Sequence, residues 1–169
     1  MDTLSLTVSD PQGNELLKIN EDTTHYYESI RSTVDVITPN SSGIGLTHTK
    51  LLVSHMPESS DIREFLNEYI VSLVPSFRDK SIVNSVLVSN DTVIIDLTKT
   101  YFQHFEAQQL SGEKEYASVY SLITTACSFS GTTKALILED GRMRSTLSGH
   151  IKLDAPLLTL PESFIKSLS

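Results

Sequence analysis

The stretch from Ser81 to Pro156 constrains the fold more than any other part of the chain. It reads as two strands around a tight turn, a long apolar helix, a glycine stop and then a hairpin. Asn90-Asp91 can adopt the positive φ angles of a hairpin turn, and Asp140-Gly141 is a strong two-residue hairpin signal. The strands that these turns delimit are Ile82–Val88, Val93–Leu97 and Lys134–Leu138.

Two helices are predicted from the spacing of apolar residues. The first presents one continuous face, with Asp61 and Glu64 as a capping box at its start. The second begins at Ser111 or Gly112, ends at Gly131, and is apolar over most of its circumference, so we expect it to be more deeply buried. The apolar face of the first helix consists of Ile62, Phe65, Leu66, Tyr69, Ile70 and Leu73.

The segment between the second strand and the second helix holds three aromatic residues. From Leu97 to Phe105 we expect a short irregular or single-turn segment containing Tyr101, Phe102 and Phe105. These rings could form an aromatic binding shelf, but core packing is the favoured interpretation, because large aromatic side chains dominate protein interiors.

The N-terminal part of the chain is patterned less clearly. Residues 1–24 are predicted to be an arm or linker, and the turn signal at Asp10–Asn14 allows a hairpin. Residues 25–38 are a predicted strand, because they are rich in β-branched and aromatic residues. Residues 46–56 are predicted to form a second strand, antiparallel to the first. We therefore divide the chain into an arm (1–24), a domain (25–160) and a C-terminal tail (161–169) with one helical turn.

The order of elements predicts an α+β fold. Strand pairs alternate with helices, which favours a two-layer sandwich in which a mainly antiparallel sheet carries two helices packed on one face. A length of 169 residues is enough for one domain with a buried core.

Charge and hydropathy exclude several classes of function. A formal net charge of −8 argues against a nucleic-acid partner, because such binding depends on clustered Lys and Arg. No apolar run reaches the ~18 residues that a membrane span requires. The residues after Met1 lack the basic start and apolar core of a signal peptide. We expect either a cytoplasmic chain or a soluble portion of an exported protein.

A search for reactive residues yields weak candidates. His48 and His55 are seven residues apart on one strand and so fall on opposite faces, and His25, His104 and His150 stand alone, which argues against a zinc site. Cys127 lies in the apolar helix, where a thiol is inert. We expect no catalytic, cofactor-binding or metal-ligating residues and no cofactor.

Two acidic positions are expected to be structural. Asp96 closes an apolar strand, and we interpret it as capping the turn that follows rather than as a ligand or catalytic acid. Glu139 and Asp140 lie at a hairpin tip, which indicates that both carboxylates are solvated.

Three stretches of the chain form a recognisable pattern: VLVSNDTVIIDLTKTYF, GEKEYASVYSLITTACSFSGTTKALILEDGRM and LSGHIKLDAPL. Together they resemble a known family, the bacterial sporulation and spore-germination (GerMN) domain. Ile95–Thr98 matches the end of a family strand, Thr124–Phe129 the threonine-rich finish of a helix, and Asp140-Gly141 a turn. The similarity extends over about residues 46–158.

The resemblance implies a non-catalytic, extracytoplasmic interaction domain of a bacterial envelope protein, similar to the ring-building domains of secretion-like assemblies. Its implied partners are an envelope protein or peptidoglycan, with self-association left open, no nucleic acid, and contact with the membrane only through a helix or lipid anchor outside this chain. The implied location is periplasmic or at the cell surface. The alternative hypothesis is a small hydrolase or ligand-binding enzyme whose site assembles from Asp96, His104 and His150.

Overall fold

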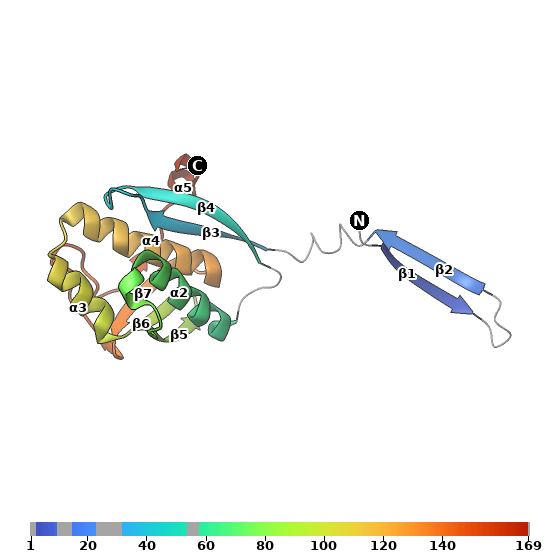
Figure 1. Ribbon diagram of the computed structural model, residues 1–169, viewed down its shortest axis with the longest axis horizontal. Coiled ribbons are helices and arrows are strands. Elements are labelled where there is room, and N and C mark those ends of the chain that lie inside the picture. Colours follow the sequence, from blue (N-terminus) through green and yellow to red (C-terminus); the bar gives the residue numbers. More distant parts are fainter. Residues whose placement is uncertain (1–2, 10–14, 23–31, 54–57, 169) are drawn as a thin grey trace. The chain divides into compact units, whose positions relative to one another are not determined.

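The computed structural model describes residues 3–9, 15–22, 32–53 and 58–168 (Figure 1). The chain divides into two compact units, one of Met1–Thr33 with Leu52–Met56 and the other of Val34–Leu51 with Pro57–Ser169. In the first unit, β1 (Thr3–Ser9) pairs antiparallel with β2 (Glu15–Asp22), which is the pairing that a hairpin arm requires. The turn expected at 10–14 and the strand residues expected at 25–31 lie outside the described residues.

The second unit contains a five-stranded sheet. Its strands are ordered β5-β6-β7-β8, and β9 also pairs with β7. All pairings are antiparallel except that of β6 with β7, which is parallel, because α3 and α4 carry the chain back to the end of the sheet where β6 began. The predicted α+β class is confirmed. The strands are β5 (Val83–Ser89), β6 (Thr92–Leu97), β7 (Lys134–Glu139), β8 (Arg142–Met143) and β9 (Leu157–Leu158).

Both predicted hairpin turns are present. Ser89 pairs with Thr92 across a turn in which Asn90 has φ 53°. Glu139 pairs with Arg142 across Asp140-Gly141, where φ is 46° and 77°. At Asp140-Gly141 φ is positive at both central residues, which is the geometry that matches the twist of the flanking strands, whereas in the first turn it is positive at Asn90 and not at Asp91.

The helices of this unit are α2 (Ser59–Leu73), α3 (Lys99–Gln108), α4 (Gly112–Ser130) and α5 (Glu162–Ser167), with a short 3-10 turn at Pro75–Phe77. The predicted limits of α4 are confirmed. The Ser111 hydroxyl accepts a hydrogen bond from the Lys114 N–H at 3.4 Å, and Gly131 ends the helix with φ 69°. Across the described ranges, no helix combines the length and apolar character needed to cross a membrane.

Two predictions about helices were wrong. The segment after β6 is a ten-residue helix, α3, because Tyr101, Phe102 and Phe105 fall on one side of it and are buried. At the start of α2, the partner of Asp61 is Glu58 and not Glu64: the Glu58 N–H donates to Asp61 Oδ2 at 3.0 Å. The helix therefore begins one turn earlier than the Asp61–Glu64 pattern indicates.

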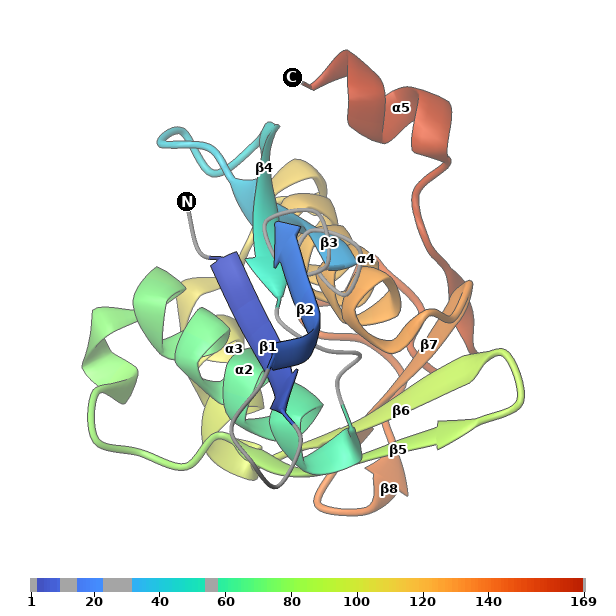
Figure 2. The ribbon, with the colours of Figure 1, turned by 90° about the vertical axis from the view of Figure 1, so that its right-hand side faces the viewer.

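α4 lies between two sheets (Figure 2). On one side it packs on β6 and β7. On the other side, the Ile37 N–H donates to Thr125 Oγ1 at 2.8 Å and the Asp35 N–H to Ser128 Oγ at 2.7 Å. Asp35 and Ile37 belong to β3 (Ser32–Pro39), which pairs with β4 (Leu46–Val53) in a separate two-stranded sheet. This second sheet explains why α4 is apolar around most of its circumference.

α2 and α4 cover the same face of the five-stranded sheet, as predicted. That face carries the buried residues of β5, β6 and β7: Val83, Val86, Val93, Ile95, Leu97, Ala135 and Ile137. The expected contribution of Leu73 is wrong, since its side chain in the last turn of α2 is 37% exposed. Tyr120 of α4 packs with Ile37, Leu160 and Ile165 on the side of β3 and α5.

Candidate functional site

A buried carboxylate marks the N-terminal end of α4. Glu115, Val119, Leu122 and Ala126 are spaced i, i+4, i+7 and i+11, so they share one face of the helix, and all four are buried. Glu115 has no exposed surface. A charge in such a position is tolerated only when hydrogen bonds replace its lost hydration.

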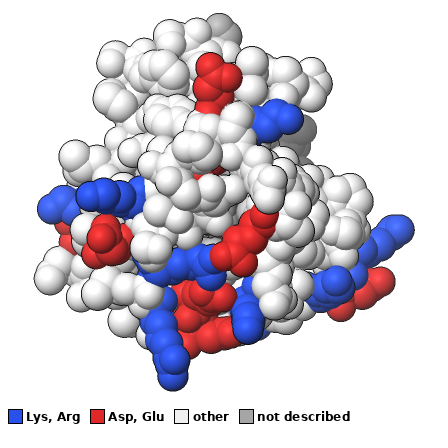
Figure 3. Space-filling model, turned by 90° about the vertical axis from the view of Figure 1, so that its left-hand side faces the viewer, with Lys and Arg blue, Asp and Glu red and all other residues white. Residues whose placement is uncertain are grey.

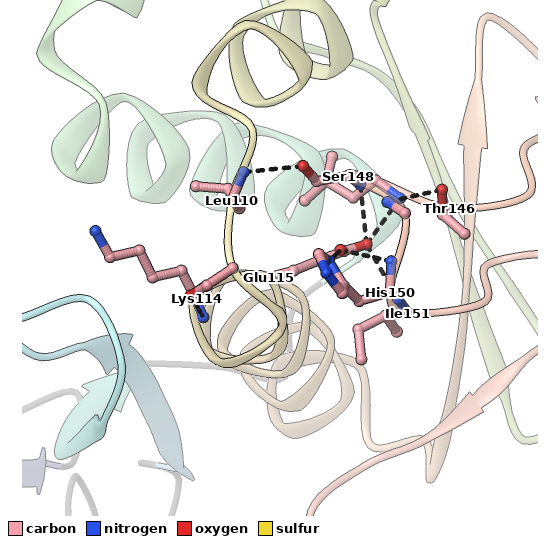
Figure 4. Close-up of polar contacts among 10 residues, drawn as sticks. Leu110, Lys114, Glu115, Thr146, Ser148, His150 and Ile151 are labelled. Carbon is pink, nitrogen blue, oxygen red and sulfur yellow. Dashed lines mark hydrogen bonds and ion pairs between the residues drawn. The ribbon is translucent and has the colours of Figure 1, made fainter.

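The loop before β9 supplies those hydrogen bonds (Figure 4). Glu115 Oε1 accepts from the backbone N–H groups of Leu147 at 3.1 Å, Ser148 at 2.9 Å and Ile151 at 3.1 Å. Glu115 Oε2 accepts from the His150 N–H at 2.9 Å and lies 2.8 Å from Nδ1 of the His150 ring. One side chain of α4 thus holds the loop of residues 146–151, which we call the clamped loop.

Two opposing effects act on the pKa of Glu115. Burial raises it, whereas the backbone N–H groups of Ser148, Ile151 and His150 and the His150 ring lower it, and the net result is a pKa below the ordinary value of 4.5. The hydrogen bonds therefore outweigh desolvation, and the carboxylate is ionised at neutral pH. A group fixed in its ionised form by five contacts is positioned for structure rather than for proton transfer.

Further contacts fasten the clamped loop to the start of α4. The Leu110 N–H donates to Ser148 Oγ at 3.0 Å, and within the loop the Gly149 N–H donates to Thr146 Oγ1 at 3.0 Å. The His150 ring lies so close to Gly112 that a Cβ added there would be 3.4 Å from its Cδ2 atom. An alanine at position 112 would therefore meet the ring at an ordinary van der Waals distance.

An open hollow of about 600 Å³ lies beside the clamped loop. Its wall combines polar side chains with Leu110 and Leu147 and takes contributions from the end of α3, the start of α4 and the clamped loop. Arg144 borders it and joins these elements: the guanidinium contacts the carboxylates of Glu106 and Glu139, and Nε donates to the Thr146 carbonyl at 2.9 Å. The lining residues are Glu106, Gln109, Leu110, Ser111, Thr146, Leu147, Ser148, Gly149 and His150.

Acidic and basic side chains are mixed over this side of the molecule. Figure 3, viewed from the side where α3 lies in Figure 1, shows Lys and Arg next to Asp and Glu. Such a surface has no single-sign field of the kind that attracts a nucleic-acid backbone.

The second surface of interest is the face of the five-stranded sheet opposite α2 and α4. Cross-strand pairs bring Leu87 beside Ile94 and Ile94 beside Leu136. Met143 pairs with Leu138, and Leu158 with Lys134. Leu87, Met143 and Leu158 are 58%, 65% and 64% exposed, so no helix covers them. We call this set the open-face cluster: Leu87, Ile94, Leu136, Leu138, Met143 and Leu158.

The structure separates the residues of the predicted hydrolase site. Asp96 Oδ1 accepts from the Gly141 N–H at 2.7 Å, His104 Nε2 lies 2.7 Å from Gln108 Nε2, and His150 contacts Glu115. No hydrogen bond joins any two of Asp96, His104 and His150. Asp96 does cap a turn, but the turn belongs to the β7–β8 hairpin and not to the segment after its own strand.

The remaining candidates also have structural partners. His48 Nε2 lies 2.7 Å from Asp35 Oδ1, whereas His25 and His55 are outside the described residues. Glu139 is half-buried and contacts Arg144, so the expectation that it is solvated was wrong. Asp140 is exposed, as expected, and its Oδ1 accepts from Asn84 Nδ2 at 3.0 Å. Within the described ranges, no three His, Cys, Asp or Glu side chains are grouped to hold a metal ion.

Sequence reasoning missed the role of Glu115. Glutamates in the first turn of a helix are ordinarily explained by the positive end of the helix dipole, which requires no specific partner. The informative signal was the position of Glu115 on the apolar stripe of the helix, where an acidic residue requires a partner.

Comparisons with known proteins add a family. A family model described as "Germane: Sporulation and spore germination" matches residues 38–145. No curated protein matches the chain. Among solved structures, the "2.5 Angstrom Crystal Structure of Putative Lipoprotein from Clostridium perfringens" is similar, with 18% identity and a TM-score of 0.43, over 77% of this chain and 89% of that one.

Proposed function

Because this chain belongs to the sporulation and spore germination family, we propose that it is a non-catalytic interaction domain and that the open-face cluster binds a protein partner. The domain would act on the outer side of a bacterial membrane. Family membership supports this location.

The observation that carries the proposal is the exposure of the open-face cluster. Large apolar side chains from five strands lie on one side of one sheet, and three of them are more than half exposed. Contiguous exposed apolar surface of this kind marks interaction sites in soluble domains. Methionine such as Met143 is enriched in protein interfaces because it adapts to different shapes.

The chemistry of the open-face cluster favours a protein over peptidoglycan. Glycan strands and their short peptides are rich in hydroxyl, amide and charged groups, which apolar side chains cannot satisfy. A protein partner can bury leucine and methionine against its own apolar residues, and the free energy gained grows with the area buried. The polar residues in the same rows, Thr92, Asp96 and Lys134, supply hydrogen-bonding groups among the apolar ones.

Co-purification from envelope fractions tests this function. The bait is the wild-type chain, compared with a double variant, Leu87→Lys with Met143→Lys, and with Phe164→Lys as a matched control. Phe164 is 42% exposed on α5, so this control adds a charge at an exposed apolar position outside the open-face cluster. We expect a protein that the wild type and the control retain and the double variant loses. Sedimentation of the purified chain shows whether that protein is a second copy.

Peptidoglycan is the second arm of the test. Purified sacculi are incubated with the same three chains, and bound protein is measured after pelleting. The assignment of the open-face cluster would be overturned if sacculi retained the double variant as well as the wild type and if co-purification found no protein partner.

A further inference from the structure

A small cavity of about 90 Å³ lies where β3, α2, α3 and α4 meet, away from the open-face cluster and the clamped loop. Four elements that are distant in sequence build it. Its most exposed lining residue is Leu73, at the end of α2, which places the mouth of the cavity there. The lining residues are Pro39, Tyr69, Ile70, Leu73, Val74, Tyr101, Phe105, Ser118 and Leu122.

The wall of the cavity carries no Asp, Glu, Lys, Arg or His. Most of it is aliphatic or aromatic, so the cavity favours an uncharged occupant with apolar surface. Its polar atoms are hydroxyl groups. That of Tyr69 is already used, because it donates to the Ile37 carbonyl of β3.

The Tyr101 hydroxyl is different. Tyr101 is 4% exposed, and its ring contacts those of Phe77, Phe102 and Phe105. Its hydroxyl has no hydrogen-bond partner among the described residues. In the described part of the chain, Thr98 Oγ1 is a fully enclosed side-chain oxygen without a hydrogen-bond partner, whereas the Tyr101 hydroxyl is not fully enclosed. The Tyr101 oxygen therefore reaches open space, and the cavity is open space that Tyr101 lines.

Burial raises the pKa of Tyr101, with a further contribution from neighbouring Tyr69. The phenol consequently stays protonated over the physiological range and remains a hydrogen-bond donor. Ser118 contributes a second hydroxyl to the wall. A ligand that carries an acceptor atom would give the Tyr101 hydroxyl the hydrogen bond that it lacks among the described residues.

We propose that this cavity is a binding site for a small neutral molecule, or the end of a larger one, that has a branched hydrocarbon group and one oxygen acceptor for Tyr101. The size of the cavity sets the size of the ligand. An apolar cavity of about 150 Å³ holds benzene and one water takes about 30 Å³, so 90 Å³ accommodates a branched group of about four non-hydrogen atoms, with more at the open mouth.

Two probes with the same branched group separate neutral from charged ligands. 3-Methyl-2-butanone carries a ketone oxygen, and isobutyrate is its anionic counterpart with the same number of non-hydrogen atoms. Each is titrated into the ¹⁵N-labelled chain and followed by amide chemical shifts. We expect saturable shifts with the ketone around Leu73, Val74 and Phe105, and none there with isobutyrate.

Variants then test the hydroxyl and the mouth. Tyr101→Phe should weaken ketone binding about tenfold, which corresponds to the loss of one hydrogen bond. Tyr116→Phe, at an exposed tyrosine of α4 outside the cavity, is the matched control and should bind like the wild type. Leu73→Trp should block ketone binding by filling the exposed mouth, and it does so without replacing a buried core residue. The amide spectrum of each free variant shows whether it is folded.

Three results would overturn the site. They are an absence of saturable shifts at the cavity residues, equal affinity for ketone and isobutyrate, or unchanged ketone affinity in folded Tyr101→Phe and Leu73→Trp chains. The open-face variant Leu87→Lys with Met143→Lys should bind the ketone normally, so this test is independent of the proposed protein partner.

Discussion

Phe65 of α2 stacks on Phe129 of α4, with ring centroids 4.0 Å apart and ring planes 8° from parallel. The contact joins the two helices that cover the five-stranded sheet. Phe65 is half-buried, and Phe129 is buried near the end of α4. This pair helps to fix how the two helices lie side by side.

Phe65→Ala should therefore lower the free energy of unfolding by about 2–4 kcal/mol, slightly below the range for a fully buried phenylalanine, because one edge of the ring is already in water. Glu68→Ala, on the exposed side of the same helix, should change it by less than about 0.5 kcal/mol. Urea unfolding of both variants measures the difference. Equal midpoints would mean that the stacked pair contributes nothing to stability.

Glu115→Gln should destabilise the domain by about 2–4 kcal/mol, because the amide has one acceptor oxygen in place of two and turns an NH₂ group towards backbone N–H donors. The matched control is Glu113→Gln, which removes an exposed carboxylate from the same turn of α4. Urea unfolding at pH 7 should leave the control close to the wild type.

The same carboxylate predicts a dependence of stability on pH. The pKa of Glu115 is lower in the folded chain than its ordinary value of 4.5, so its stabilising contribution is complete above pH 4.5 and is lost as the pH falls through the folded-state pKa. Unfolding measured from pH 7 to pH 3 should therefore show a smaller decline for Glu115→Gln than for the wild type. Parallel curves for the two chains would contradict this linkage.

The Cys127 thiol should be unreactive in the folded domain. Burial raises the pKa of the thiol to about 11, so almost no thiolate is present at pH 8. The side chain is also buried, which keeps reagents away from the sulfur. Reaction with Ellman's reagent at pH 8 should be slow in buffer and rapid in concentrated urea. Rapid labelling of the native chain would show that this part of α4 opens readily.

Gly131→Ala should lower stability by about 1 kcal/mol, because Gly131 ends α4 with φ 69° and a Cβ disfavours this left-handed conformation. No other atom lies within 4 Å of an added Cβ, so the cost comes from the backbone and not from a clash. Gly131→Asn should cost less, since asparagine tolerates positive φ. Thermal unfolding of both variants distinguishes the two contributions.

Local signals in the sequence were sufficient for the elements and turns. The positive φ angles of Asn90, Asp140 and Gly141, the cap at Ser111 and the stop at Gly131 all depend on residues close in the chain. For this reason both hairpins and the limits of α4 were predicted correctly. α3 was missed, because its helical state depends on burying aromatic rings against other parts of the domain.

Features made by distant residues could not be predicted. The sequence does not reveal that β3 and β4 leave the main sheet, because the hydrogen bond from Ile37 to Thr125 spans 88 residues. The site posed the same difficulty. The position of Glu115 on an apolar stripe indicates that it needs partners, but its partners are backbone N–H groups, which almost every residue carries.

The clamp on residues 146–151 has a consequence for how this region can evolve. Glu115 holds the loop through four backbone N–H groups, and only the His150 ring adds a side-chain contact to the carboxylate. Any residue except proline can donate such a bond. Side chains on the outer side of the loop are thus free to vary while the path of the chain stays fixed, so related proteins can present different surfaces beside the same hollow.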